Sequence, residues 1–460
     1  MTIAPRRLHH QAQAVARRPP AQLCALFEPW IQWADAREPG TRQRLFTPAV
    51  TFWLFLAQVL AKGSACRETL RHFLVRLCAE TGKTASPQTA AYCKARARLP
   101  AAELDRARRR VAEKIETKTQ SNLWHGRVVK VVDGSSISMP DTPDNQRAWP
   151  QPAKQKPGCG FPVMRIVAIF SLASGALLEL ARGPLTVHER TLFRDRWDTL
   201  RRGDVVLADR GFGGYADFWC LAQRGVDAVM RKNARRINAG RVKNIGKNDA
   251  LVRWKKSGRC PPWLDEKSWR EIPEIMTVRQ ITVTVATPGF RARTIIIVTT
   301  LLDPHLFTAA DFAELYRRRW RAELYLRDIK TTMGMEILRC KTPAMIEKEL
   351  AIHLIAYNLI RALMLEAATR YRLPPERLSF QGAIATVRQW SPAIAAEMRP
   401  LIRHNLYRHL LYYLAADLLP HRPDRVEPRA RKRRPKNYQL LNKPRKTFTA
   451  INHRNKYRKA

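Results

Sequence analysis

Residues 127–134 read RVVKVVDG and residues 204–209 read DVVLAD, and these two stretches decide the predicted fold. Both are short runs rich in valine, which is typical of buried strands. Each run ends in an aspartate, Asp133 in the first and Asp209 in the second. A pair of buried strands this far apart in the chain indicates a sheet with connecting elements between them.

The elements between and after these strands complete the pattern. Residues 163–183, VMRIVAIFSLASGALLELARG, predict two strands around a turn near Ser174 and Gly175. A polar helix precedes Asp209, and a helix over 215–223 and a strand over 226–232 follow it. The order of strand, two hairpin strands, helix, strand, helix and strand predicts an α/β fold, a mixed sheet layered by helices.

Changes in periodicity and charge divide the chain further. We expect a helical N-terminal domain, the first part of an α/β core, a β-rich insertion, the rest of the core with a long helix over 309–333, a C-terminal helical region and a basic, disordered tail. Their expected bounds are 1–125, 126–232, 233–300, 301–373, 374–429 and 430–460. Residues 421–460 hold 15 Lys or Arg and 2 Asp or Glu, a composition typical of a tail that contacts phosphate.

Charge points to the class of partner. The 460 residues include 83 Lys or Arg and 39 Asp or Glu, a formal net charge of +44. A protein this basic usually has a polyanion as its partner, and nucleic acid is the common one. The hydrophobic fraction of 45% is that of a globular protein and argues against wholesale disorder. A ribosomal or nucleoid scaffold shares the charge and is the rival class.

Cysteine spacing and apolar runs exclude other classes. The eight cysteines contain no Cys-x-x-Cys pair, so they predict neither a zinc ribbon nor a small disulfide framework, and reduced thiols are expected. The longest apolar run, residues 51–61, is too short to span a bilayer and predicts a buried helix. We therefore expect no membrane partner.

A basic helix near the N-terminus is a candidate DNA contact. Ser86 and Pro87 resemble a helix start, and the segment that follows carries Lys94, Arg96 and Arg98. A short basic helix beside a helical pair can enter a DNA groove. A solvated surface helix explains the same residues equally well.

The two aspartates are candidate metal ligands. Side chains just beyond the ends of strands are held rigidly and exposed together, and Mg²⁺ prefers carboxylate oxygen with water completing its coordination. Asp209 is followed by Arg210 and a glycine-rich loop, and Asp133 by Gly134. The alternative is that each aspartate simply begins a turn.

The segment YRRRWRAELYLRDIK supplies a third carboxylate. Tyr316, Arg319, Glu323 and Lys330 stand at offsets 0, 3, 7 and 14, which places them on one stripe of a helix, and Arg327 joins that stripe. A single carboxylate among cations indicates a site that grips phosphate beside a metal. An intrahelical lattice of Glu and Arg explains the spacing equally well.

Taken together, the motifs resemble those of a known family. VVDGSSISMP, VVLADRGFGGYADF and Y-x2-R-x3-E-x6-K occur in the order of the three signature regions of IS4-family bacterial transposases, which carry a DDE triad on an RNase H-like core. The third motif matches at Tyr316, Arg319, Glu323 and Lys330. The resemblance covers roughly residues 40–370.

This resemblance implies a mechanism. Asp133, Asp209 and Glu323 would hold two Mg²⁺ or Mn²⁺ ions across a scissile phosphate of double-stranded DNA. Cleavage at terminal inverted repeats would be followed by strand transfer into target DNA. Tyr316, Arg319 and Lys330 would contact DNA near the cut, and Arg327 and Arg210 are further candidates.

The family also implies details outside the triad. Some members form a DNA hairpin and stack a flipped base on a tryptophan of the insertion, for which Trp254, Trp263 and Trp269 are candidates; a core position is the alternative for each. Paired ends require two subunits, so a homodimer on DNA is expected, in the bacterial cytoplasm and associated with the nucleoid. A nuclease without strand transfer and an inactive DNA-binding derivative remain alternative functions.

Overall fold

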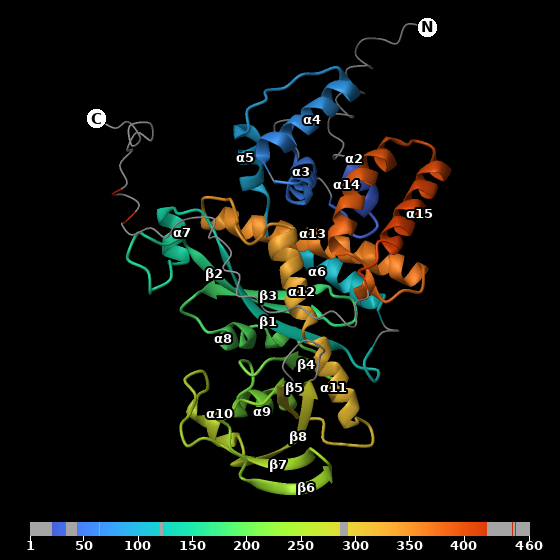
Figure 1. Ribbon diagram of the computed structural model, residues 1–460. Coiled ribbons are helices and arrows are strands. Elements are labelled where there is room, and N and C mark those ends of the chain that lie inside the picture. The colour runs from blue at the N-terminus through green and yellow to red at the C-terminus, as the bar shows by residue number, and fades with distance from the viewer. Residues whose placement is uncertain are drawn as a thin grey trace, which may run out of the picture.

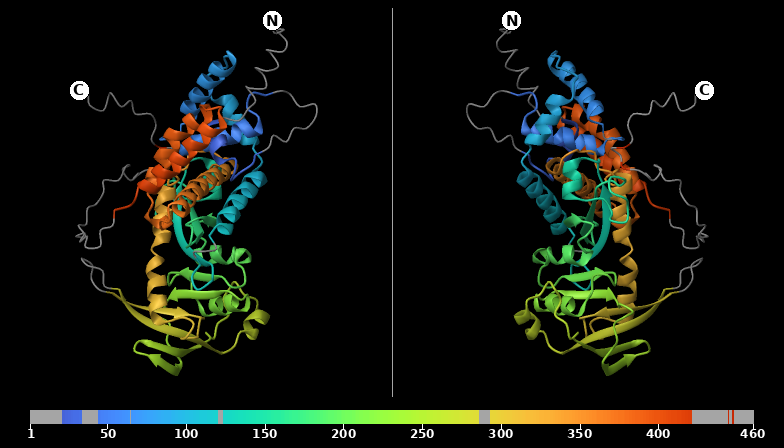
Figure 2. Two further views of the ribbon diagram at one scale, coloured as in Figure 1. Left: turned by 90° about the vertical axis from the view of Figure 1, so that its right-hand side faces the viewer. Right: turned by 90° about the vertical axis from the view of Figure 1, so that its left-hand side faces the viewer.

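The fold was examined in a computed structural model that describes residues 21–33, 44–63, 65–119, 123–285 and 293–420, with Pro444 and Thr447 (Figure 1). The basic tail predicted over 430–460 therefore lies almost wholly outside the described residues. Helices from both ends of the chain gather at one end of the molecule, and a long sheet occupies the other (Figures 1 and 2).

Five strands form the centre of the sheet, and their order identifies the core. They are β1 (Val129–Ser138), β2 (Val163–Ser171), β3 (Leu177–Pro184), β4 (Val205–Ala208) and β5 (Asp227–Arg231). They lie in the order β3-β2-β1-β4-β5, with β2 antiparallel to both neighbours and β4 and β5 parallel to β1. This is the RNase H-like arrangement, and it confirms the predicted fold class.

The predicted turn between the hairpin strands is present, but the predicted end of β1 is wrong. Gly175 adopts a φ of +71°, which a glycine tolerates at a tight turn. β1 does not end at Asp133 and Gly134; it continues to Ser138 because β2 pairs with it over that whole length. A long antiparallel partner therefore overrides the turn preference of an Asp-Gly pair.

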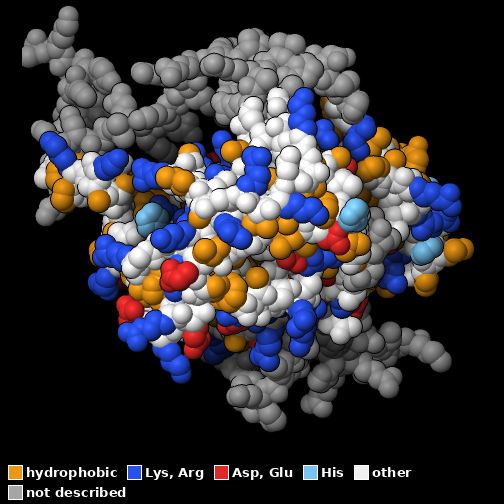
Figure 3. Space-filling view, turned by 90° about the horizontal axis from the view of Figure 1, so that it is seen from below, with side chains coloured by type: hydrophobic (Ala, Val, Ile, Leu, Met, Phe, Trp, Pro, Cys, Tyr) orange, Lys and Arg blue, Asp and Glu red, His pale blue; other side chains and the backbone are white. Residues whose placement is uncertain are grey.

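The segment expected as an insertion extends the same sheet. It contains β6 (Gly240–Gly246), β7 (Asp249–Lys255), β8 (Ile275–Val285) and β9 (Arg293–Thr299), with the short helix α10 (Glu266–Glu271). β9 pairs antiparallel with β5, so one nine-stranded sheet runs from β3 to β6. The outermost strand, β6, is exposed along most of its length. Lys and Arg side chains are spread over this end of the molecule, with fewer acidic ones among them (Figure 3).

Helices cover both faces of the sheet (Figure 2). One face carries α8 (Glu189–Arg194) and α9 (Tyr215–Gln223), whose Phe193 and Phe218 pack with Val132 and Ala208. The other face carries α6 (Ala101–Thr117), α12 (Arg321–Arg327) and α13 (Pro343–Arg370), which pack with Val131. Alternate residues of each strand thus enter different hydrophobic clusters.

The N-terminal helices are α2 (Ala21–Phe27), α3 (Pro48–Leu60), α4 (Cys66–Thr81) and α5 (Ala90–Arg98). Thr47 caps α3 by accepting a hydrogen bond from the backbone N–H of Val50 at 3.2 Å, as the Thr-Pro pair predicts. The predicted start of the basic helix at Ser86 and Pro87 is wrong, since α5 begins only at Ala90.

The C-terminal part adds the long α13, then α14 (Phe380–Ala396) and α15 (Pro400–Ala416). Of the described helices, α13 alone is long and apolar enough to cross a membrane, but 89% of its apolar window is buried inside the structure. It is therefore packed as a core helix. All eight cysteines are free thiols, in line with the prediction.

Candidate active site

Asp133 and Asp209 each come directly after the last residue that pairs β1 with the parallel strand β4, so they are neighbours. The last aligned pair of β1 and β4 is Val132 with Ala208, so the next residue on each strand is an aspartate. Val132 and Ala208 point toward α8 and α9. Because side chains alternate along a strand, Asp133 leaves the sheet on the opposite face, the face that carries α12. Asp209, the residue after β4, is placed to do the same.

The segment that carries the third carboxylate is not one continuous helix. α11 (Ala309–Arg318) ends before Arg319, α12 begins at Arg321, and a π-helical turn, η3 (Asp328–Thr332), follows. The junction is tightened by bonds to the third preceding residue, such as that from the Glu323 N–H to the Trp320 carbonyl at 3.2 Å. The prediction of an unbroken helix over 309–333 is therefore wrong. Tight and wide turns within a helix often occur at functional sites.

This broken helix still brings the signature side chains to the aspartates. The Tyr316 hydroxyl donates to Asp209 Oδ1 at 3.3 Å. Burial raises the pKa of Tyr316, so the hydroxyl stays protonated and able to donate. One helical turn further along, Arg319 Nη2 donates to Glu323 Oε1 at 3.2 Å. The contacts form a chain from Asp209 to Glu323.

Lys330 reaches the same region from the π-helical turn. Its ammonium donates to the hydroxyl of Ser135, two residues beyond Asp133 on β1, at 2.9 Å. An open cleft of about 380 Å³ lies between this part of β1 and the helix. Its lining residues are Asp133, Gly134, Ser135, Glu323, Leu326, Arg327, Lys330 and Thr331. Carboxylates and cations therefore share one opening.

The electrostatics of Asp133 are unusual. Burial, the largest cause, raises the pKa of its carboxyl to about 6, and the charges of Glu323 and Glu189 act in the same direction. A hydrogen bond from the Gly134 N–H at 2.9 Å and the charge of Arg319 act against that rise. A negative potential of this kind disfavours an ionised carboxylate unless a cation offsets it.

The carboxylate oxygens suit a divalent cation, but the side chains that carry them are not clustered around one position. Carboxylate oxygen is the ligand that Mg²⁺ and Mn²⁺ prefer, and Asp133 and Glu323 line one cleft. Even so, within the described ranges no three His, Cys, Asp or Glu side chains form a metal cluster. Glu323 is instead ion-paired with Arg319.

Comparison with known proteins agrees with this geometry. The family model described as "Transposase DDE domain" matches residues 124–359, which is slightly more than half of the chain. The chain belongs to the DDE transposase family. It is 26% identical over 432 residues to the transposase InsG for insertion sequence element IS4 of Escherichia coli (strain K12), covering 92% of this chain and 94% of that protein. The IS4-family resemblance is thereby confirmed.

One solved transposase structure is more distantly similar to this chain. The piggyBac transposase in its synaptic complex with hairpin DNA aligns with a TM-score of 0.40 and 7% identity over 86% of each chain.

One residue predicted to bind DNA, Arg96, proves to be structural in this transposase. Arg96 is buried, its guanidinium lies over the rings of Phe55 and Tyr92, and it donates to Gln58 at 3.5 Å. It cannot reach DNA from there, so that prediction is wrong. Lys94 and Arg98 are both exposed on α5, so a DNA contact by either stays a prediction.

The tryptophans proposed to stack a flipped base are also packed. Trp254 and Trp269 are buried in the cluster under α9, which makes them core residues. Trp263 is half-buried, and the Arg194 guanidinium already covers its ring at 3.9 Å from the centroid. The base-stacking role is therefore contradicted for Trp254 and Trp269, and Trp263 is not a free ring.

Two residues near the cleft were missed by sequence reasoning. Trp320 lies at the junction of α11 and α12, three residues before Glu323, and is 57% exposed. Glu189 begins α8, and its carboxylate lies so close to Gly134 that a Cβ there would stand 2.3 Å from the carboxyl carbon. The signal for Trp320 was its place inside the signature motif. Nothing in the sequence links Glu189 to Gly134.

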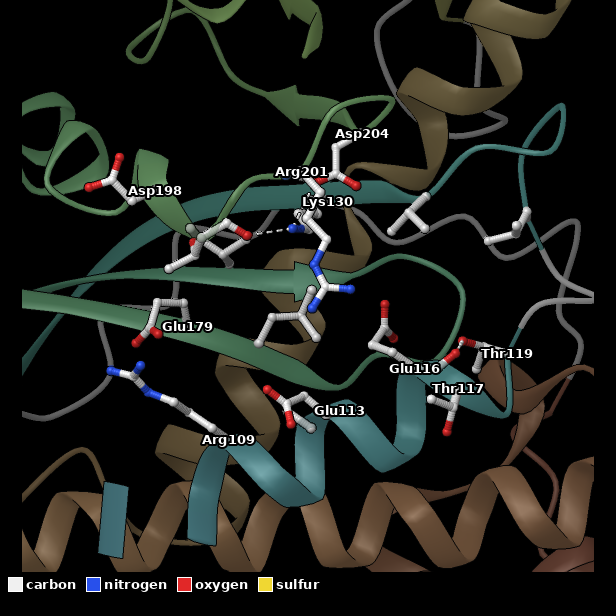
Figure 4. A pocket seen from close by; sticks show the side chains of 16 residues that line it. Arg109, Glu113, Glu116, Thr117, Thr119, Lys130, Glu179, Asp198, Arg201 and Asp204 are labelled. Carbon is white, nitrogen blue, oxygen red and sulfur yellow. Dashed lines mark hydrogen bonds and ion pairs between the residues drawn. The ribbon is translucent and has the colours of Figure 1, made fainter. Parts of the chain in front are cut away.

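A second cavity, of about 560 Å³, lies at the other end of the parallel strands (Figure 4). Its wall carries several carboxylates, but two of them are held inside the fold. Asp204 pairs with Lys130 at 2.7 Å and Glu179 with Arg108 at 2.9 Å. These pairs tie α6 and the strand starts together, on the opposite edge of the sheet from Asp133 and Asp209.

Proposed function

We propose that this transposase binds the terminal inverted repeats of an insertion sequence, cleaves the DNA at their ends and joins those ends to target DNA. The single observation that supports the proposal is that Asp133 and Asp209 occupy neighbouring positions directly after the last aligned pair of β1 and β4. They are the next residues in register on adjacent parallel strands, and they lead toward the face where Glu323 stands. A turn-forming role for either aspartate explains neither the shared register nor the shared face.

In this proposal Asp133, Asp209 and Glu323 hold one or two Mg²⁺ or Mn²⁺ ions. A divalent cation there would polarise the scissile phosphate and stabilise the charge that develops on its oxygens. The Tyr316 hydroxyl fixes the orientation of the Asp209 carboxylate through its 3.3 Å hydrogen bond. The Glu323 side chain lines the cleft and is 39% exposed.

The cations around the cleft would bind the phosphate backbone. Lys330 donates a hydrogen bond to Ser135 on β1. Arg327 lines the cleft, and its side chain is 58% exposed. Arg210 is exposed on the loop after Asp209. Guanidinium and ammonium groups bind phosphate through charge-assisted hydrogen bonds. Trp320 adds an exposed ring beside Glu323 on which a DNA base could stack. Paired ends would require two copies of the chain.

The test is a cleavage assay on DNA that carries the sequences flanking the gene. Purified protein is incubated with this DNA and Mg²⁺, and the cuts are mapped at nucleotide resolution. We expect cuts at the inverted repeats that leave 3′-hydroxyl ends, and products joined to a second DNA. Glu323→Gln should abolish both, whereas Glu314→Gln, which changes an exposed carboxylate on α11, should not.

Two outcomes would contradict the proposal. Cuts without any joined product, under conditions that keep the paired ends together, would favour a nuclease. Specific binding without cutting in either Mg²⁺ or Mn²⁺ would favour an inactive DNA-binding derivative.

A further inference from the structure

Arg319 is bonded to Glu323, one of the three proposed cation ligands. Its guanidinium bonds to Glu323 at 3.2 Å, and its side chain is only 14% exposed. Burial lowers the pKa of this guanidinium, but Tyr316, Asp209 and Asp133 raise it by more, so the net shift is upward. The carboxylates and the guanidinium therefore stabilise one another's charges.

The position of this charge explains why the ligands are not assembled. In the part of the chain that the structure describes, no cluster of three acidic or other metal-binding side chains is present. Glu323 is held by Arg319, and Asp209 is held by the Tyr316 hydroxyl. A divalent cation at Glu323 Oε1 competes with the guanidinium for that oxygen, and the positive charge of the guanidinium opposes a cation at either oxygen. The guanidinium of Arg319 therefore weakens the binding of a divalent metal ion to Glu323.

A DNA phosphate is a competing partner for the guanidinium. Arginine binds phosphate through two parallel charge-assisted bonds, a geometry that matches its planar fork. Arg319 lies in the tightened junction between α11 and α12, at the border of the cleft that Glu323 lines. A phosphate that takes Arg319 would leave the three carboxylates without their counter-charge and so would favour a cation between them.

We propose that Arg319 couples cation binding to DNA binding: in the free protein its guanidinium occupies the carboxylates and weakens their affinity for divalent cations, and a DNA phosphate withdraws it. The inference rests on the proposed function, because it takes Asp133, Asp209 and Glu323 as the cation ligands. Linkage requires the coupling to be reciprocal, so a bound cation strengthens DNA binding by the same factor. The protein would then bind its cation tightly only on DNA.

The experiment measures Mn²⁺ binding to the full chain, by electron paramagnetic resonance of the free ion, with and without DNA. The DNA is a duplex that already ends at the cut, so no hydrolysis accompanies binding. Without DNA, Arg319→Gln should bind Mn²⁺ about tenfold more tightly than the unaltered chain, within the usual range of coupling between sites. DNA should then strengthen Mn²⁺ binding much less in Arg319→Gln than in the unaltered chain.

Matched variants separate this coupling from a general loss of charge. Arg317→Gln removes the same charge from an exposed position two residues away and should leave the Mn²⁺ affinity nearly unchanged. Arg319→Met is a second neutral variant that keeps the aliphatic stem, for use if Arg319→Gln folds poorly. Equal Mn²⁺ affinities in the unaltered chain and both neutral variants, without DNA, would overturn the coupling.

A further variant distinguishes failure of the coupling from failure of the proposed site. Asp209→Asn, in the unaltered chain and in Arg319→Gln, should remove the Mn²⁺ binding. If binding persists, the proposed cation ligands are wrong and the inference falls with them. If binding is lost but Arg319→Gln binds no more tightly than the unaltered chain, the ligands stand and Arg319 is only a DNA contact.

Discussion

Asp133 illustrates how a site residue can cost stability. Its carboxyl has a pKa of about 6 in the folded chain, mainly because it is buried, whereas an unfolded aspartate titrates near about 3.9. Above pH 6 the folded chain therefore holds an ionised carboxylate that the unfolded chain solvates better. This is the opposite of the usual effect of an ion-paired aspartate, whose carboxylate stabilises the fold at neutral pH.

We predict that Asp133→Asn raises the free energy of unfolding at pH 7.5 by roughly 1–3 kcal/mol while abolishing cleavage. The gain should shrink as the pH falls through 6 and be small at pH 4, where the folded carboxyl is protonated and the unfolded one is about half protonated. Urea unfolding at the two pH values, without added divalent cation, measures it. A variant less stable than the unaltered chain at pH 7.5 would contradict the burial of a costly charge.

Trp320 is exposed, so we expect it to matter little for stability and more for DNA binding. With its side chain 57% exposed, Trp320→Ala should change the free energy of unfolding by only about 0.5 kcal/mol. If a base stacks on the ring, the same change should weaken DNA-end binding by about 1–3 kcal/mol, and Trp320→Phe should restore most of it. Fluorescence anisotropy with a duplex end measures the affinities. Unaltered binding by Trp320→Ala would exclude the stacking role.

At the scale of elements, β1 and α8 fit together only because residue 134 lacks a side chain. An added Cβ would stand 2.3 Å from the Glu189 carboxyl carbon, far inside contact distance. Beside it, Arg190 donates to the Gly211 carbonyl at 3.0 Å, so the first turn of α8 touches the segments that follow both aspartates. The start of α8 thus supports the edge of the sheet from the face opposite to the cleft.

We predict that Gly134→Ala destabilises the fold by about 1 kcal/mol at most, because the flexible end of the Glu189 side chain has to move away. Glu189→Ala removes the clash, so the double variant should be more stable than the sum of the two single changes implies, a positive coupling in a double-mutant cycle. Thermal unfolding of the four proteins measures the cycle. Additive effects would mean that Glu189 does not contact Gly134.

Some of these elements could be predicted from the sequence alone, and others could not. The valine-rich strands, the turn at Gly175 and the cap of α3 follow from local patterns, so they could be predicted. The break at Arg319 and the π-helical turn could not, because they depend on packing against β1, where Lys330 meets Ser135. The burial of Arg96 was hidden for a similar reason, since α5 packs that residue against α3 through Phe55.

At the scale of the molecule, the two ends differ in architecture. The helices gather at one end and the β-rich sheet at the other, and α11 and α12 run along the sheet between them (Figures 1 and 2). The proposed catalytic cleft, between β1 and α12, therefore lies between these two ends of a protein with a net charge of +44. A surface this basic attracts DNA over a wide area, so the cleft need supply only the contacts near the cut.

The basic tail should supply part of that attraction. Residues 430–460, which lie largely outside the described ranges, hold 12 Lys or Arg and no Asp or Glu. Each phosphate that a protein neutralises adds about 0.9 to the magnitude of the slope of log affinity against log salt for duplex DNA. We predict that deletion of 430–460 weakens DNA binding at low salt and makes that slope shallower, as anisotropy titrations between about 50 and about 300 mM salt would measure.

A length-matched variant isolates the charge. Replacing the tail's Lys and Arg residues with Gln should lower the slope as much as the deletion does, because counterion release depends on charge and not on chain length. Cleavage at saturating DNA should change little in either variant, since the tail is not part of the proposed catalytic cleft. An unchanged slope in the Gln variant would mean that the tail does not contact phosphate and that the folded domains carry the whole electrostatic contribution.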